Sequence, residues 1–291
     1  MLICQLTDLH VRPDNAAPDY GAPDYGAPDY GANDAAAGTS ALTERACRVV
    51  AAFTPLPDVV IITGDLTEAG LDSEYAHLSA ILARTLSMPV YVIPGNHDRR
   101  ESLRAGLAHL PGVTIDPYFV QYAIDDYPVR LVMLDTLVPG ANHGALSDQQ
   151  LQWLDQTLTA EPSKPTLVGM HHPPFITGLP HMDKIALRDP EAFRSVIARH
   201  RQVERIACGH QHRPVVGQCA QAIVTIASSV AYQLELTFDP CNAGAFNFEP
   251  PAFLLHKWCK ENGFVSHTVY TDSYRGPFPF LIDDDRPGQQ T

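Results

Sequence analysis

Five short polar motifs carry the residue types that bind metal ions and transfer protons. Together they supply aspartate, histidine and asparagine side chains, and no cysteine. In chain order the motifs are Asp8-Leu9-His10, Gly64-Asp65, Gly95-Asn96-His97-Asp98, His171-His172-Pro173-Pro174 and Gly209-His210-Gln211-His212. Such a donor set suits manganese, iron, cobalt or zinc in a reactive site better than a structural, cysteine-rich zinc site.

The number of donors predicts two metal ions. We count seven candidate ligands, Asp8, His10, Asp65, Asn96, His171, His210 and His212. Seven ligands are too many for one small transition-metal ion that also keeps an open position. They suit two ions about 3.5–4 Å apart that share a carboxylate, with a bridging hydroxide as the nucleophile. A single motif of this kind often arises by chance, so the prediction depends on the ordered set of five.

The segments before the motifs indicate buried strands, because they are short, apolar and rich in β-branched residues. These segments are 2–7, 59–63, 90–94, 129–134, 166–170, 205–208 and 222–227. Helical patterns alternate with them, one opening with a capping box at Ser147 and another with Asp189-Pro190. The alternation predicts an α/β fold in which the carboxyl ends of the strands form one crevice, where distant motifs can meet.

Two regions depart from this alternation. We expect a catalytic domain over residues 1–239 and a small C-terminal β appendage over 240–291, with a hairpin formed by 246–258 and 264–270. The sequence PDYGA occurs three times over residues 18–32, which predicts a loop lengthened by tandem duplication. Tyr30 is our candidate for a substrate-facing ring there, and a solvated loop without contact is the alternative.

Composition excludes several classes of partner. A net charge of −13 opposes binding to a nucleic acid polymer, which requires basic side chains. No apolar run is long enough to span a membrane, and the N-terminus lacks a basic region and a cleavage site, so we expect a cytoplasmic protein. The six cysteines form no CxxC pair, and buried free thiols are expected.

The five motifs, in this order, resemble those of the calcineurin-like metallophosphoesterases. Within that superfamily the chain is similar to bacterial class III cyclic-nucleotide phosphodiesterases and glycerophosphodiesterases, also through Glu249 to His256 and Tyr274 to Pro277. The resemblance implies a two-sheet α/β/β/α sandwich and a tail that contributes to a homo-oligomer, a dimer or larger. It fails mainly at the PDYGA repeats.

The resemblance also implies roles for individual residues. One metal would be held by Asp8, His10 and His212, the other by Asn96, His171 and His210, with Asp65 bridging them. His97 would stabilise the transition state or protonate the leaving alkoxide, and Asp98 could orient it or cap the next helix. His172 is expected beside the ligands or facing the substrate. His143, Arg99, Arg100 and Arg213 could approach the substrate or be ordinary loop residues.

The leading functional hypothesis is hydrolysis of small phosphodiesters, of the glycerophosphodiester or dialkyl phosphate type, by a metal-bridging hydroxide. A 3′,5′-cyclic nucleotide phosphodiesterase is the alternative. A phosphomonoesterase comes third, because the acidic chain shows no obvious basic clamp for a dianion. A noncatalytic scaffold would be expected to lose a ligand or the equivalent of His97, and the sequence retains all of them.

Overall fold

The computed structural model describes residues 1–12 and 38–278. The PDYGA repeats and Tyr30 lie outside these residues, so the expectations about them stay predictions. Within the described chain, two large β-sheets and six helices form one layered α/β arrangement, and a two-stranded ribbon is added to it.

The first sheet has five strands in the order β13-β12-β1-β2-β3. Its parallel core is formed by β1 (Leu2–Leu6), β2 (Val59–Thr63) and β3 (Val90–Ile93). Every residue of β2 is buried, as expected for a strand that is covered on both faces of its sheet. These three strands confirm the first three that the apolar segments predicted.

The second sheet has six strands in the order β4-β5-β6-β7-β9-β8. They are β4 (Tyr122–Ile124), β5 (Arg130–Met133), β6 (Thr166–Gly169), β7 (Val203–Cys208), β8 (Val215–Cys219) and β9 (Ala222–Ile226). The four inner strands run parallel, whereas β4 and β8 are antiparallel edges. Neither edge strand was predicted from the sequence, because β4 is short and β8 is only partly buried.

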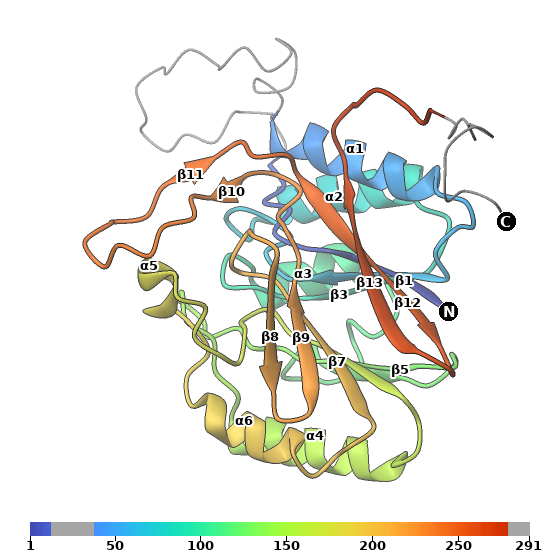
Figure 1. Cartoon of the computed structure of the whole chain (residues 1–291), viewed down its shortest axis with the longest axis vertical. Helices are drawn as coiled ribbons and strands as arrows, with labels where there is room; N and C mark the ends of the chain where they lie inside the picture. Colours follow the sequence, from blue (N-terminus) through green and yellow to red (C-terminus); the bar gives the residue numbers. More distant parts are fainter. Residues whose placement is uncertain (13–37, 279–291) are drawn as a thin grey trace, which may run out of the picture.

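Alternating residues of the second sheet divide the apolar interior into two parts. Leu131 and Met133 point into the core that the two sheets share, while Val132 and Leu134 join the core under the outer helices. The helices are α1 (Thr39–Ala51), α2 (Asp72–Thr85), α3 (Arg100–Leu107), α4 (Asp148–Ala160), α5 (Pro180–Asp183) and α6 (Pro190–Ile197). Figure 1 shows α1 and α2 on one side of the sheets and α4 and α6 on the other, which confirms the α/β/β/α sandwich.

Both predicted helix starts are confirmed. The Ser147 hydroxyl accepts a hydrogen bond from the Gln150 backbone amide, and the Gln150 side chain reaches back to the Ser147 amide. The Asp189 side chain accepts a hydrogen bond from the Ala192 amide, with Pro190 as the first helical residue. These caps satisfy amide groups that have no partner inside a helix.

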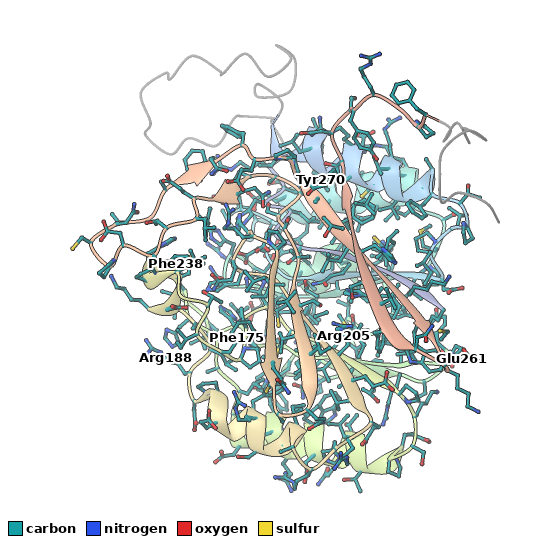
Figure 2. The ribbon with its side chains drawn as sticks, in the orientation of Figure 1. Phe175, Arg188, Arg205, Phe238, Glu261 and Tyr270 are labelled. Carbon is teal, nitrogen blue, oxygen red and sulfur yellow. The ribbon has the colours of Figure 1, made fainter. Side chains whose placement is uncertain are left out.

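The C-terminal segment contributes to the first sheet. β12 (Ala252–Cys259) and β13 (Gly263–Tyr270) form an antiparallel hairpin, and β12 pairs with β1. The hairpin begins later than predicted, because Pro250 and Pro251 have no amide hydrogen to donate. Residues 233–247 form a second ribbon from β10 (Gln233–Leu234) and β11 (Phe246–Asn247). The connection between these two short strands carries Phe238, which is exposed (Figure 2).

Two expectations from composition can be compared with the structure. No helix in the described ranges is long and apolar enough to cross a membrane. All six cysteines are free thiols, and Cys4, Cys47, Cys208 and Cys219 are buried. The expectation of buried thiols therefore holds for four of them, while Cys241 is exposed and Cys259 is partly exposed.

A buried chain of polar side chains joins the C-terminal hairpin to both sheets. The amide nitrogen of Gln5 donates to the Thr63 hydroxyl (3.0 Å) and to the Cys208 carbonyl (2.8 Å). Its carbonyl oxygen therefore accepts from His256 Nε2 (3.0 Å), which leaves His256 Nδ1 as the acceptor for the Ser266 hydroxyl (2.7 Å). Burial, and then the Arg205 guanidinium, lower the pKa of His256 to about 3, so His256 is neutral in the folded protein.

This network predicts a loss of stability in mild acid. Between the ordinary histidine pKa of 6.5 and about 3, the unfolded chain takes up a proton at His256 that the folded chain does not. The free energy of unfolding should therefore fall as the pH decreases, by about 2 kcal/mol from this residue between pH 7 and pH 5. Urea unfolding of the metal-free protein at both pH values measures it. His256→Gln should remove this part of the pH dependence, whereas His267→Gln, at an exposed site on β13, should leave it unchanged.

Candidate metal centre

The first two motifs lie side by side because β1 and β2 continue to pair beyond their ends. The amides of Leu9 and His10 donate to the Asp65 carbonyl (2.8 and 3.0 Å), and the Val11 amide donates to the Leu66 carbonyl (3.2 Å). The loop after β1 and the loop after β2 are therefore fixed to one another. Their acidic side chains, Asp8 and Asp65, are both buried.

The motif residues have an unusual backbone conformation. Seven non-glycine residues in the described chain have a positive φ, and five of them belong to the motifs. These five are Asp8 (51°), His10 (47°), Asp65 (49°), His210 (71°) and His212 (53°). Such conformations cost about 1–3 kcal/mol each and typically occur at functional sites, where the surrounding structure holds them.

One group of donor atoms gathers around Asp8. Four side chains, Asp8, His10, Asp65 and His212, each offer a ligand atom within 4.8 Å of the others. His212 Nε2 lies 3.1 Å from His10 Nε2 and 3.5 Å from Asp8 Oδ1. His10 Nε2 lies 3.7 Å from Asp65 Oδ2.

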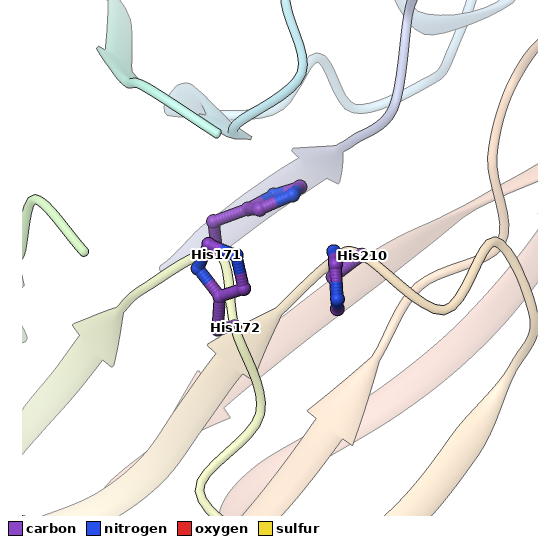
Figure 3. A group of neighbouring side chains, drawn as sticks. All are labelled: His171, His172 and His210. Carbon is purple, nitrogen blue, oxygen red and sulfur yellow. The ribbon is translucent and has the colours of Figure 1, made fainter. Parts of the chain in front are cut away.

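A second group gathers on the other side of Asp65. His171 Nε2 lies 3.4 Å from Asp65 Oδ2 and 3.2 Å from Asn96 Oδ1. The rings of His171 and His210 are 5.2 Å apart. Figure 3 shows His171 and His172 where the chain leaves one strand, and His210 after the neighbouring strand. The structure therefore brings six of the predicted donors together around Asp8 and Asp65, and it places the seventh, His210, beside His171.

Acceptor groups around the site fix the orientation of the histidine rings. The Nδ1 atom of His10 donates to Glu68 (2.9 Å), that of His171 to the Thr63 carbonyl (2.8 Å) and that of His212 to the Tyr232 carbonyl (3.0 Å). Because Nδ1 carries the proton of the neutral ring, each Nε2 faces inward as the potential metal donor. His210 has the opposite orientation, since its Nε2 donates to the Ile185 carbonyl (3.1 Å).

The spacing of these atoms fits metal coordination. Two ligands at about 2.1 Å from one ion are roughly 3.0–3.4 Å apart for bond angles near 90–110°. His10 and His212 at 3.1 Å, and His171 and Asn96 at 3.2 Å, lie in this range. With no proton between them, the facing Nε2 lone pairs of His10 and His212 would repel one another, and a cation would remove that repulsion. The donor set therefore fits two metal ions.

The titration behaviour of the site also fits positive charge supplied from outside the chain. Burial raises the pKa of Asp8 to about 6. Burial would also raise the pKa of Asp65, but the His171 and His97 rings hold it well below its usual range. Burial lowers the pKa of His210 to about 3 and that of His212 to about 4, so these rings are neutral donors. Burial likewise favours neutral His171, but the Asp65 carboxylate raises its pKa to about 9.

His97 lies beside the donor cluster with one ring nitrogen held by the protein. Its backbone amide donates to Asp65 Oδ1 (2.9 Å), and its Nδ1 donates to the Glu68 carbonyl (2.8 Å). Burial would lower the pKa of His97, but the Asp65 carboxylate and the Glu68 carbonyl raise it. These neighbours favour the protonated ring, which can donate a proton from Nε2.

Asp98 neither orients His97 nor caps α3, the two roles that the sequence left open. Its carboxylate accepts hydrogen bonds from the backbone amides of Leu66 (3.0 Å) and Gly95 (2.9 Å) and from the Tyr75 hydroxyl (2.7 Å). It therefore ties the loop of Asp65 to the loop of Asn96 and His97.

The residues suggested as substrate contacts have varied surroundings. His172 is fully buried, and its ring nitrogens bond the Thr136 hydroxyl (2.8 Å) and the Asn142 carbonyl (3.2 Å). Both ring nitrogens of His172 therefore have protein partners, and the ring also belongs to a possible metal-binding group with His171 and His210. His143 is half-buried in the loop that packs on His172, and a substrate contact by either residue stays a prediction.

A cavity of about 370 Å³ opens beside the donors. Its lining includes Asn96, His97, Arg99, Arg100, Leu137 and Gly140. Arg100 forms a bidentate ion pair with the buried Asp135 (2.6 and 2.8 Å), whereas Arg99 is exposed at this cavity. Arg213 lies elsewhere and pairs with Glu249 (2.9 Å).

The turn after β9 also supports the site, and the sequence analysis did not identify it. The Ser229 hydroxyl donates to the Asp8 carbonyl (2.7 Å) and accepts from the Ala231 amide (2.9 Å). The Tyr232 ring packs against His10 and His212, with ring centres 5.3 and 4.6 Å apart. The position of this turn in the sequence could have identified it. Ser228 and Ser229 directly follow the apolar segment 222–227, just as each of the five motifs follows an apolar segment.

Comparisons with known proteins agree with this geometry. The family model described as calcineurin-like phosphoesterase matches residues 1–214. A protein of Arcobacter nitrofigilis named "Probable glycerophosphodiester phosphodiesterase GpdQ" is 36% identical over 227 residues, which cover 78% of this chain and 82% of that protein. One of Rhodopseudomonas palustris, named as a "Probable cyclic nucleotide phosphodiesterase", is 38% identical over 235 residues, covering 78% and 83%. Among solved structures, a dimetal phosphatase from Danio rerio has a similar fold, with a TM-score of 0.60, 19% identity and coverage of 94% and 99%.

The close approach at Gly95 gives a prediction about metal content. A Cβ atom on Gly95 would lie 2.2 Å from Asp65 Oδ1 and 2.4 Å from the Asp65 backbone nitrogen, so Gly95→Ala must displace the Asp65 carboxylate together with one of the two loops. We expect the variant to bind fewer than two metal ions per chain, measured by elemental analysis after reconstitution. In Gly140→Ala the new Cβ meets no atom within 4 Å, although φ is +75° there. That control should lose about 1–2 kcal/mol of stability from backbone strain and keep its metal. Full metal content in Gly95→Ala would contradict the assignment of Asp65.

Proposed function

This chain belongs to the calcineurin-like phosphoesterase family, and we propose that it hydrolyses small phosphodiesters, glycerophosphodiesters first, with two metal ions. One observation carries the proposal: His97 and a cavity adjoin two neighbouring groups of aspartate and histidine donors, one containing Asp65 and the other containing His171 and His210. If the phosphoryl group of the substrate binds at the metal donors, the alcohol that leaves would lie beside His97.

We assign the donors to two metal sites. The first site comprises Asp8, His10 and His212, the second comprises Asn96, His171 and His210, and Asp65 is common to both. When bound, two divalent ions, or a divalent and a trivalent ion, would neutralise phosphoryl oxygens and supply a solvent nucleophile at neutral pH. Manganese, iron, cobalt and zinc are all compatible with these nitrogen and oxygen donors.

His97 is our candidate for the general acid. Its Nδ1 is committed to the Glu68 carbonyl, so a protonated ring presents its second N–H from Nε2. That proton would pass to the oxygen of the departing alcohol as its bond to phosphorus breaks. The raised pKa of His97 keeps a larger fraction of the ring protonated at neutral pH.

The surroundings of the arginines favour a diester over a monoester. A phosphate monoester brings a second negative charge that a basic clamp would have to neutralise. Arg100 and Arg213 are instead paired with Asp135 and Glu249. A diester, with one negative charge, makes no such demand.

Other properties stay proposals of the same kind. A 3′,5′-cyclic nucleotide is the alternative substrate, supported by the name of the relative from Rhodopseudomonas palustris. We propose a cytoplasmic homo-oligomer without a nucleic acid or membrane partner. We also propose that residues 1–239 are the catalytic unit and that 240–291 contribute to oligomerisation, although β12 and β13 extend the first sheet.

The substrate class can be tested with four compounds. The protein reconstituted with Mn²⁺ or Co²⁺ should hydrolyse bis(p-nitrophenyl) phosphate and glycerophosphoethanolamine faster than p-nitrophenyl phosphate, because Arg100 at the cavity is already paired with Asp135. Faster hydrolysis of cyclic AMP than of the other compounds would favour the alternative, a 3′,5′-cyclic nucleotide substrate. Chelation should abolish turnover, and adding either metal should restore it. Turnover by a verified metal-free preparation that equals that of the reconstituted protein would contradict the proposal.

The role of His97 predicts a separation of chemistry from metal binding. His97→Ala should keep two metal ions while kcat falls about 10²–10⁴-fold, the range for losing a general acid. Diesters with good leaving groups should suffer less, because their alkoxides need less protonation. His109→Ala, at an exposed position after α3, serves as the control. A loss of one metal equivalent in His97→Ala would instead make His97 a ligand.

A further inference from the structure

Glu68 lies next to the donor cluster, and none of the five motifs includes it. It is the third residue after Asp65, in the loop that pairs with the loop of Asp8 and His10. The pairing continues through a bridge between Val11 and Thr67, and the Glu68 amide donates to the Val11 carbonyl (3.4 Å). This register places the Glu68 side chain beside His10.

Both carboxylate oxygens of Glu68 are engaged. Oε2 accepts the Nδ1 hydrogen of His10 at 2.9 Å, and Oε1 pairs with the Arg12 guanidinium at 3.0 Å. The Glu68 side chain is only 15% exposed, which limits its screening by solvent. The two oxygens therefore join the His10 ring to the Arg12 guanidinium.

The support of His10 differs from that of the other two rings that face inward through Nε2. His171 and His212 donate their Nδ1 hydrogens to main-chain carbonyls, of Thr63 and Tyr232. His10 donates to a charged side chain instead. A carboxylate in this position fixes the tautomer and makes the opposite nitrogen a stronger metal donor.

We propose that Glu68 is a positioning residue that holds His10 with its Nε2 lone pair directed at the first metal site. This inference rests on the proposed function for the identity of that site. It concerns the Glu68 side chain alone, because His97 bonds the Glu68 main-chain carbonyl, which a substitution retains.

The test is a Co²⁺ titration of the metal-free protein, followed by visible absorbance. In Glu68→Gln one metal equivalent should bind about 10–100-fold more weakly, the range for losing such a partner, and the other should be unchanged. The thermal midpoint of the metal-free variant should stay close to that of the parent, because glutamine has nearly the same shape. Wild-type affinity for both equivalents would overturn the proposal.

Glu74 provides a matched control in the same part of the chain. Its buried carboxylate accepts hydrogen bonds from the Ala69 and Leu71 amides, both at 3.0 Å, and does not reach the donors. Glu74→Gln should lower the thermal midpoint and leave both Co²⁺ affinities unchanged. An equal loss of metal affinity in Glu74→Gln would show that loop stability, and not the contact with His10, controls binding.

Kinetics provide a second readout. At saturating Co²⁺, Glu68→Gln should recover kcat to within a few-fold, because His97 keeps its main-chain partner. A large loss of kcat at full occupancy would overturn the assignment to His10. Arg12→Gln should weaken the binding of the same Co²⁺ equivalent by a smaller factor, because Arg12 holds Glu68 in place. This variant tests the contact between Glu68 and His10 if Glu68→Gln does not fold. If the parent protein binds Co²⁺ but hydrolyses no diester, the proposed function fails while the predicted affinity difference stays measurable.

Discussion

Two carboxylates buried where the sheets meet, Asp8 and Asp65, set the main constraint on this structure. An ionised carboxylate costs several kcal/mol to remove from water unless charges or hydrogen bonds offset that cost. Backbone amides provide part of the offset, since those of His210 and His97 donate to Asp8 and Asp65. The His210 and His212 rings are neutral and add no charge to offset what remains, so a cation would complement the site.

The rest of the site follows from holding these groups still. Five motif residues have left-handed backbone conformations, which persist only because neighbouring loops fix them. The pairing of residues 9–11 with Asp65 and Leu66, the Asp98 carboxylate and the Ser229 hydroxyl each connect two such loops. The strained backbone conformations and the hydrogen bonds that hold them therefore lie at the same end of the sheets, next to the buried strands.

The histidine rings of the candidate metal centre are held in orientation by two kinds of hydrogen-bond acceptor, main-chain carbonyls and a side-chain carboxylate. Carbonyls of Thr63, Tyr232 and Ile185 orient three histidines through the backbone, which no substitution of those side chains removes. The Glu68 carboxylate orients a fourth, His10, through a side chain. The two kinds of support differ in charge, and only a side-chain partner such as Glu68 can be removed by substituting that partner.

The sequence by itself determined the family and the layered fold. It also predicted the donor residues, because Asp8, Asp65, His171 and His210 each follow an apolar strand and parallel strands end at one edge. It could not identify the residues that orient them. Glu68 reaches His10 only through the register of two loops, and Ser229 meets Asp8 across 221 residues of chain. It also could not assign Asp98, whose partners come from three separate segments. Such contacts are non-local hydrogen bonds without a periodic signal, so only the tertiary structure decides them.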